Sequence, residues 1–401
     1  MIAGSAWLLD LTRLVSRLGR GPLTGIDRVE LAYLTHILTR PEPVFALVRT
    51  ALGFVLLDRP GAQGVLDRAI GIVPLGPPDI LGLMTQRHLP QVLRAEADMR
   101  RLAIARCLPF ALGAMLRKRL PPGCCYVNVG HANLSVRVMQ AVKSIPGATT
   151  VVMVHDTIPL DHPQFCRADV VAAFGQKMAA VASHADLVIH TAHSSRAQTE
   201  THFGAAPAGI VAPLGIDLPA PDVQALGPVR QPYFVALGTI EPRKNIGLLI
   251  KVWAALQNAG GPVPHLYIVG NRGWAEPDLF DDIEALVGWG HATLMHNLGD
   301  GAVAALLQGA QALLFPSMAE GYGLPPIEAA ALGVPVFAGK LPVVVELLAD
   351  YPVYLDTSDV YAWTEAIHLR MRGGARGHDG DQQRRVPPSW ADHFDLVFGK
   401  A

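Results

Sequence analysis

The chain has 401 residues, half of them hydrophobic, and a formal net charge of −1 at pH 7. This length predicts two domains, and the composition indicates a globular protein that is neither disordered nor a nucleic-acid binder. The four cysteines show no C-x-x-C spacing, which argues against a zinc site or a disulfide framework and fits a reducing compartment.

The first residues, MIAGSAWLLDLTRL, do not resemble a signal peptide, because Asp10 interrupts the apolar stretch and no small-residue cleavage site follows. No apolar run reaches the roughly 18 residues that a bilayer-spanning helix needs. We therefore expect a cytoplasmic protein that can contact the inner face of the cell membrane.

Residues 19–38, GRGPLTGIDRVELAYLTHIL, begin with a glycine loop and continue as an amphipathic helix. Thr24 and Asp27 have the spacing of a capping box at the start of this helix. A glycine loop that leads into a helix can bind phosphate, although on sequence alone an ordinary turn explains these residues better.

Residues 87–119 are basic and carry only two acids, Glu96 and Asp98. The spacing puts Arg94 and Arg101 on one helical face, but Pro109 interrupts the segment, so no continuous membrane helix is predicted. A solvated helix surface and a surface that docks on anionic lipid headgroups both remain open.

Two buried strands are predicted in the first half, TTVVMVHD (149–156) and ADLVIHTA (185–192), with a helix between them. His155 and Asp156 end the first strand and are expected to project into a cleft between the domains. Asn128 and His131, in YVNVGHANL, are similar candidates. A single histidine at a strand end is more often structural.

Residues 215–232 are rich in proline and glycine and are expected to link the domains. Beyond them, apolar strands alternate with helices of about ten residues, which is typical of a parallel sheet covered by helices on both faces. The predicted strands are 233–239, 265–270, 312–317 and 334–338. We expect domains at 1–217 and 218–387, with a last helix at about 388–401 that can pack back on the first domain.

The stretch FPSMAEGYGLPPIEAAALGVPV (315–336) places two acids around a glycine loop. The prolines at 325–326 suit the first turn of a helix, so Glu320 is expected in the loop after a strand and Glu328 one turn inside the helix. Ligands bind at this edge of parallel α/β sheets.

The backbone N–H groups of Gly321, Tyr322 and Gly323, together with the helix dipole, would attract an anion. Carboxylates beside such a site suit hydroxyl groups, so a nucleotide sugar fits the pattern. The spacing alone equally allows Glu320 to be a solvated loop acid and Glu328 to complement the helix N-terminus.

A second loop, GTIEPRKNIGLL (238–249), follows the strand at 233–239. It contains Gly238, and then Arg243 and Lys244 near the start of the next helix. Paired cations at a strand end suit a diphosphate.

EGYGLPPIE resembles the E-x7-E signature of retaining glycosyltransferases, and GTIEPRKN resembles their diphosphate-binding loop. With LGDGAVAALLQGAQALLFPS between them, residues 233–340 resemble glycosyltransferase family 4 (group 1), and TGIDR resembles a bacterial, mannosyltransferase-like branch. The resemblance implies the GT-B fold, with two Rossmann-like α/β domains whose parallel sheets face each other across a deep cleft.

The resemblance also implies roles for individual residues. Arg243 and Lys244 would bind the diphosphate, Glu320 the hydroxyls of the donor sugar, and Glu328 the ribose. The remaining implied donor contacts are Gly238, Gly321, Tyr322, Gly323 and Leu324, with Gly25 reaching the donor from the other domain and His155 near the sugar. Weaker candidates for acceptor contacts are Arg28, Asp156, Asn128 and His131.

The expected activity is retaining transfer of a hexose, of mannose or glucose type, from a nucleotide sugar to a saccharide or polyprenyl-linked saccharide of a bacterial surface polysaccharide. The chain has no D-x-D pair suited to a metal–diphosphate bridge, so we expect no metal and no cofactor. A nucleotide-sugar epimerase and a non-catalytic nucleotide-sugar-binding protein remain alternatives. A dehydrogenase fits less well, because YIVGNRGW lacks the dinucleotide glycine fingerprint.

Overall fold

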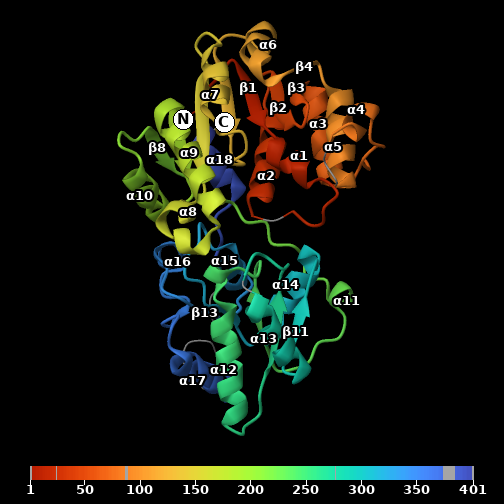
Figure 1. Ribbon diagram of the computed structural model, residues 1–401. Helices are drawn as coiled ribbons and strands as arrows, with labels where there is room; N and C mark the ends of the chain where they lie inside the picture. The colour runs from red at the N-terminus through yellow and green to blue at the C-terminus, as the bar shows by residue number, and fades with distance from the viewer. Residues whose placement is uncertain (1, 24, 86–88, 276, 374–383, 400–401) are drawn as a thin grey trace. The chain divides into compact units, whose positions relative to one another are not determined.

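The computed structural model describes residues 2–23, 25–85, 89–275, 277–373 and 384–399. The chain divides into two compact units (Figure 1). The first comprises Met1–Leu160, Ala168–Leu214 and Trp390–Ala401, and the second comprises Asp161–Arg167 and Gly215–Ser389. The second unit thus resumes at Gly215, three residues before the predicted boundary.

An eight-stranded sheet forms the centre of the first unit. Its spatial order is β4 (Ala105–Cys107), β3 (Gly53–Asp58), β2 (Val44–Thr50), β1 (Ala6–Asp10), β5 (Cys124–Asn128), β6 (Thr149–Val154), β7 (Leu187–His190) and β8 (Ala208–Val211).

This sheet is not wholly parallel, which corrects the prediction. β3 runs antiparallel to β2, and β4 antiparallel to β3. Only residues 51 and 52 separate β2 from β3, and such a short turn can reverse the chain but cannot carry it back for a parallel pairing. The other pairings in the sheet are parallel.

A six-stranded sheet, parallel throughout, forms the centre of the second unit. Its order is β11 (Ala292–Met295), β10 (His265–Val269), β9 (Tyr233–Leu237), β12 (Leu313–Phe315), β13 (Val336–Ala338) and β14 (Val353–Tyr354). From β9 the chain builds outward to β11, then returns to β12 and builds the other way, so the strand order reverses between β9 and β12.

The helices that surround the first sheet are α1 (Thr12–Arg17), α2 (Ile26–Thr39), α3 (Arg59–Ala69), α4 (Ile80–Leu83), α5 (Pro90–Leu102), η1 (Pro109–Ala111), α6 (Leu112–Arg119), α7 (Val136–Lys143), α8 (Ile158–Asp161), α9 (Ala168–His184), α10 (His193–His202) and α18 (Trp390–Phe398). The second unit has η2 (Pro163–Phe165), α11 (Val223–Leu226), η3 (Pro242–Lys244), α12 (Ile246–Asn258), α13 (Pro277–Gly288), α14 (Asp300–Gln308), α15 (Leu324–Ala331), α16 (Pro342–Leu348) and α17 (Val360–Met371).

Each sheet buries its own apolar core. In the first unit α6, α7 and α9 pack on one face of the eight-stranded sheet. In the second unit α12, α13 and α17 pack on one face of the six-stranded sheet. The last helix, α18, packs against α2 and β1 through an aromatic cluster in which Phe398 lies 5.2 Å from Trp7 and Phe394 lies 5.2 Å from Tyr33, between ring centroids. Because each of these helices contacts the sheet on only one face, its sequence has apolar residues on that face and polar residues on the other.

The structure describes α2 from its N-cap, Gly25, at φ 46°. Asp27 pairs with Arg13 and Arg17. Thr24, and with it the predicted capping box, lies outside the described residues, as does most of the polar stretch 373–385. Among the helices that the structure describes, none is both long and apolar enough to cross a bilayer.

Candidate active site

The second sheet brings two loops together that are far apart in the sequence. β9 and β12 are hydrogen-bonded neighbours, with Leu313 opposite Val235, and the loops after these strands carry Lys244 and Glu320. Parallel strands place their carboxyl ends at one edge, and the reversal of strand order between β9 and β12 leaves an opening for a ligand there.

Glu320 bridges both basic residues. Its Oε1 accepts a hydrogen bond from Lys244 Nζ at 2.5 Å, and its Oε2 accepts one from Arg243 Nη1 at 2.7 Å. Arg243 Nη1 also donates to the carbonyl of Ala319 at 3.0 Å, and the backbone carbonyl of Arg243 accepts from Met318 N–H at 2.8 Å. The two loops are therefore joined by side chains and backbone alike.

Lys244 reaches Glu320 because a glycine leaves room for it. At Gly238 a Cβ would lie 3.0 Å from Lys244 Cε, and the backbone there has φ +143°, which side chains rarely allow. The ammonium also lies 5.1 Å from the centre of the Phe315 ring, within cation–π range. Lys244 is 8% exposed, so its position is fixed by packing as well as by charge.

The charges at this site favour an ionised Glu320. Burial by itself raises the pKa of this carboxyl, but Lys244 and Arg243 outweigh the burial and lower the pKa below its ordinary value. A carboxylate between two cations accepts hydrogen bonds and cannot donate one. Glu320 is thus suited to orient N–H and O–H donors.

The loop after Glu320 ends at Gly323, the N-cap of α15, at φ 81°. The helix begins at Leu324 with proline in its first turn, as predicted. Tyr322 and Gly323 are buried, whereas Glu328 is half-buried inside α15. The predicted order of loop acid, glycine turn and helical acid is therefore correct, while the ribose contact of Glu328 stays a prediction.

In the first unit the buried His155 follows β6, and the half-buried His131, after β5, lies beside it. Their ring centroids lie 5.0 Å apart, and His155 Nε2 bonds the carbonyl of Val129 at 2.7 Å. Burial lowers the pKa of His155 to about 4. This imidazole is therefore neutral near pH 7, and its contact with a donor sugar stays a prediction.

The other candidates of this unit have structural partners. Asn128 is fully buried and donates to Tyr126 Oη and to the carbonyl of Ala132. Asp156 accepts from Ile158 N–H at 3.1 Å, and Arg28 donates to the carbonyl of Leu23 at 3.2 Å. Their roles toward an acceptor stay predictions, as does that of Gly25.

A polar network that the sequence motifs did not predict surrounds Asp10, at the end of β1. This fully buried carboxylate accepts hydrogen bonds from Thr12 N–H, Tyr126 Oη and Asn133 Nδ2, each at 3.0 Å. β1 lies between β2 and β5, where the strand order of the first sheet reverses. The available signal was an acid that ends the buried strand AWLLD and is followed by a helix.

Several arginines of the basic segment 87–119 are bound to acids or backbone carbonyls of the protein. Arg100 pairs with Asp79 at 2.6 Å, Arg101 pairs with Asp98 at 2.8 Å, and Arg94 donates to the carbonyls of Gly76 and Leu75. These arginines fasten α5 to the segment before it. The membrane contact expected for residues 87–119 stays a prediction. Arg87 lies outside the described residues.

No group of three or more His, Cys, Asp or Glu side chains in the described ranges is arranged to hold a metal ion. The basic side chains that the described site contains are those of Arg243 and Lys244, and their contact with a diphosphate stays a prediction.

Residues 222–378 match the family described as glycosyl transferases group 1. The chain carries a glycosyltransferase group 1 domain. This domain contains both loops of the site, and the resemblance expected from EGYGLPPIE and GTIEPRKN is confirmed.

The relatives of the chain include two named mannosyltransferases. It is 30% identical over 251 residues to the serotype-specific mannosyltransferase WbdA of Escherichia coli, covering 54% of this chain and 28% of WbdA. It is 33% identical over 173 residues to the O-antigen chain mannosyltransferase RfbU of Salmonella typhimurium, covering 40% of this chain and 47% of RfbU. The matches thus span between a quarter and a half of these relatives.

The fold is that of solved GT-B glycosyltransferases. Anabaena HepE in complex with UDP-glucose is similar with a TM-score of 0.62 at 15% identity, over 92% of this chain and 90% of HepE. Sucrose-phosphate synthase of Thermosynechococcus elongatus is similar with a TM-score of 0.59 at 16% identity, over 98% and 94%. The GT-B fold class is confirmed. The cleft expected between the domains stays a prediction.

Proposed function

We propose that this protein is a retaining glycosyltransferase that moves a hexose from a nucleotide sugar to a saccharide or polyprenyl-linked saccharide acceptor. The observation that carries the proposal is the bridge from Glu320 to both Arg243 and Lys244, at the strand-order reversal of a group 1 domain.

In this proposal the two cations bind the donor diphosphate. A lysine ammonium carries three N–H donors and an arginine five; Lys244 donates to Glu320, and Arg243 donates to Glu320, Glu241 and the carbonyl of Ala319. They stabilise the negative charge that grows on the leaving diphosphate, and because the loops hold them in place, little reorganisation is needed during the reaction.

Glu320 holds sugar hydroxyls while it keeps the cations in position. Its lowered pKa makes it an acceptor throughout the neutral range. In this scheme the leaving phosphate oxygen takes the proton of the acceptor hydroxyl, so no protein side chain is needed as a general base.

The relatives favour a mannose donor, because WbdA and RfbU are named mannosyltransferases. A glucose donor remains the second choice, supported by the HepE complex with UDP-glucose. RfbU is named for the O-antigen chain, so we assign the acceptor to bacterial surface polysaccharide synthesis, at the cytoplasmic face of the membrane.

The deciding experiment is a panel of GDP-mannose, UDP-glucose and UDP-N-acetylglucosamine, each incubated with and without a mannose-terminated saccharide. Transfer predicts that nucleoside diphosphate is released in an acceptor-dependent way and that the product keeps the donor's anomeric configuration by NMR. An epimerase would convert the donor without acceptor, and a binding protein would retain it unchanged. Unaltered turnover in EDTA is expected if Arg243 and Lys244 take the place of a metal.

A further inference from the structure

The first unit has an open hollow of about 250 Å³ between η1–α6 and α7. Its polar lining comes from Arg117 on α6, from Arg137 and Gln140 on α7, and from Ser144 just after α7, while Phe110 of η1 forms an apolar edge. Two guanidinium groups and an aromatic ring thus border one small depression.

The charge around this hollow is one-sided. Between Asp98 and Asp156 the sequence has no acidic residue. The same interval holds eight basic residues, Arg100, Arg101, Arg106, Arg117, Lys118, Arg119, Arg137 and Lys143. A basic region without acids on a protein of net charge −1 is a strongly asymmetric distribution.

Three of these eight basic residues pair with acids, but the two arginines that line the hollow do not among the described residues. Arg100, Arg101 and Lys143 pair with acids. Within the part of the chain that the structure describes, Arg117 and Arg137 form no salt bridge, although both are exposed. Arginine forks of this kind match phosphate oxygens.

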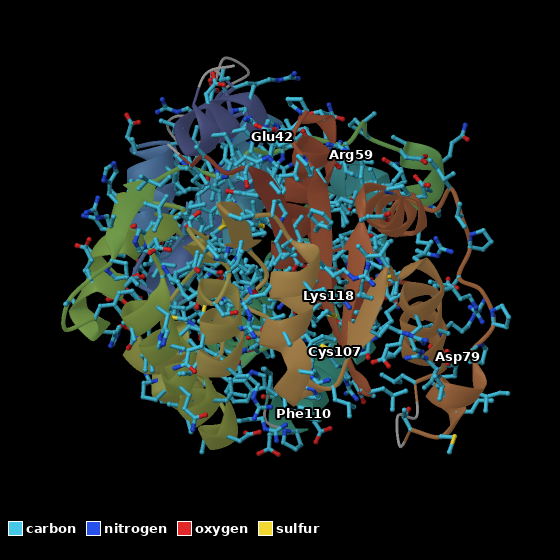
Figure 2. The ribbon with its side chains drawn as sticks, turned by 90° about the horizontal axis from the view of Figure 1, so that it is seen from above. Glu42, Arg59, Asp79, Cys107, Phe110 and Lys118 are labelled. Carbon is cyan, nitrogen blue, oxygen red and sulfur yellow. The ribbon has the colours of Figure 1, made fainter. Side chains whose placement is uncertain are left out.

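Apolar side chains project beside these charges. Phe110 is 84% exposed and Leu108 is 54% exposed, on either side of Pro109. In Figure 2, which views the molecule from above relative to Figure 1, Phe110 and Lys118 are labelled near opposite ends of the α6 segment. An exposed aromatic ring next to several cations is costly in water and suits the headgroup region of a bilayer.

We propose that this surface, formed by η1, α6 and α7, docks on an anionic lipid bilayer, with a headgroup phosphate held in the hollow between Arg117 and Arg137. Phe110 and Leu108 then enter the boundary with the acyl chains. Charge attraction and apolar insertion act together, as a reversible membrane contact requires. The docking goes beyond glycosyl transfer and does not depend on it.

Vesicle co-sedimentation at low salt tests the docking. Wild-type protein should bind vesicles of phosphatidylglycerol and phosphatidylcholine and stay in solution with phosphatidylcholine alone. The double variant R117E/R137E should weaken binding more than about tenfold, because each basic residue near such a surface contributes about fivefold. Phe110→Ser should weaken it at least about fivefold through lost insertion. All three positions are exposed, so melting temperatures should be unchanged.

Matched controls lie in the second unit. Lys251→Glu reverses one exposed charge on α12, and Tyr361→Ser removes a ring that is 74% exposed on α17. Both should bind vesicles like wild type. The proposal is overturned if wild type ignores anionic vesicles at low salt, if R117E/R137E binds as well as Lys251→Glu, or if single-stranded RNA prevents vesicle binding while inorganic phosphate at equal charge does not.

Glycosyl transfer to a free saccharide separates this proposal from the proposed function. R117E/R137E should keep the turnover of wild type in that assay while its binding to vesicles is weakened. Loss of turnover with vesicle binding retained would overturn the docking surface and leave the transfer reaction standing. Absence of transfer in wild type would count against the proposed function without touching the vesicle result.

Discussion

Lys244 Nζ and Glu320 Oε1 lie 2.5 Å apart although 76 positions separate the residues in the sequence. The side chain of Glu320 is 7% exposed and that of Lys244 is 10% exposed, so this is a nearly buried ion pair. Removal of one partner from such a pair leaves an uncompensated charge, which costs far more than loss of an exposed pair.

Glu320→Ala should reduce transfer at least about a hundredfold, because both the sugar contact and the alignment of the two cations are lost. It should also lower the free energy of unfolding by about 3 kcal/mol. Steady-state kinetics and thermal melting measure the two effects. A bound nucleoside diphosphate should raise the melting temperature of this variant more than that of wild type, because its negative charge replaces the missing carboxylate.

The matched control is Glu284→Ala, which removes an exposed acid paired with Arg272 in the same unit. It should change stability by less than about 1 kcal/mol and leave turnover intact. Near-normal transfer by Glu320→Ala would refute the assignment of this acid.

Replacing Arg243 and Lys244 together by alanine should remove most nucleotide affinity. Charge-assisted hydrogen bonds to phosphate contribute about 1.5 to 3 kcal/mol each, so a loss of at least about a hundredfold is expected. Titration calorimetry with nucleoside diphosphate measures it. Arg272→Ala serves as control, and an unchanged dissociation constant in the double variant would exclude these cations from the donor site.

Gly238→Ala should disturb the site both through Lys244 and through the backbone of its own loop. The new Cβ would lie 3.0 Å from Lys244 Cε and would strain a backbone at φ +143°, at a cost of about 1 to 3 kcal/mol. Nucleotide affinity should fall about tenfold. Gly247→Ala in α12 is the control, because its Cβ meets nothing nearer than Leu279 Cδ1 at 3.7 Å, and it should be neutral or slightly stabilising. Equal affinities in the two variants would contradict the role of Gly238.

His393 should make stability depend on pH. Its Nδ1 donates to the carbonyl of Pro213, and its Nε2 accepts from Tyr33 Oη at 2.7 Å, an arrangement that requires the neutral ring. Burial lowers its pKa to about 4, below the value of about 6.5 for an unfolded histidine.

The unfolded chain therefore binds more protons between these two pKa values. The contribution of His393 is complete above about pH 6.5 and is lost as the pH falls toward 4, by about 2 to 3 kcal/mol. Urea unfolding at several pH values measures the slope. His393→Gln should be less stable near pH 7 and show a shallower slope, and identical slopes would disprove the assignment.

The sequence predicted four of the six strands of the second sheet and the residues of its two loops, whereas β11 and β14 were not predicted. Apolar strands spaced by ten-residue helices predict parallel pairing, since only a crossover helix joins parallel neighbours. The prolines of PPIEAAALG marked the start of α15 and a glycine its end. Local signals of this kind do not depend on distant parts of the chain.

Only the tertiary structure decided how those residues are arranged. Nothing in GTIEPRKN or EGYGLPPIE states that one acid serves both cations, because that contact depends on β9 and β12 being neighbours. The inward partners of Arg100 and Arg101 have the same origin, as does the lack of a salt bridge at Arg117 and Arg137 among the described residues. Each depends on which acids and carbonyls packing brings within about 3 Å, and a one-dimensional pattern of charges does not contain that information.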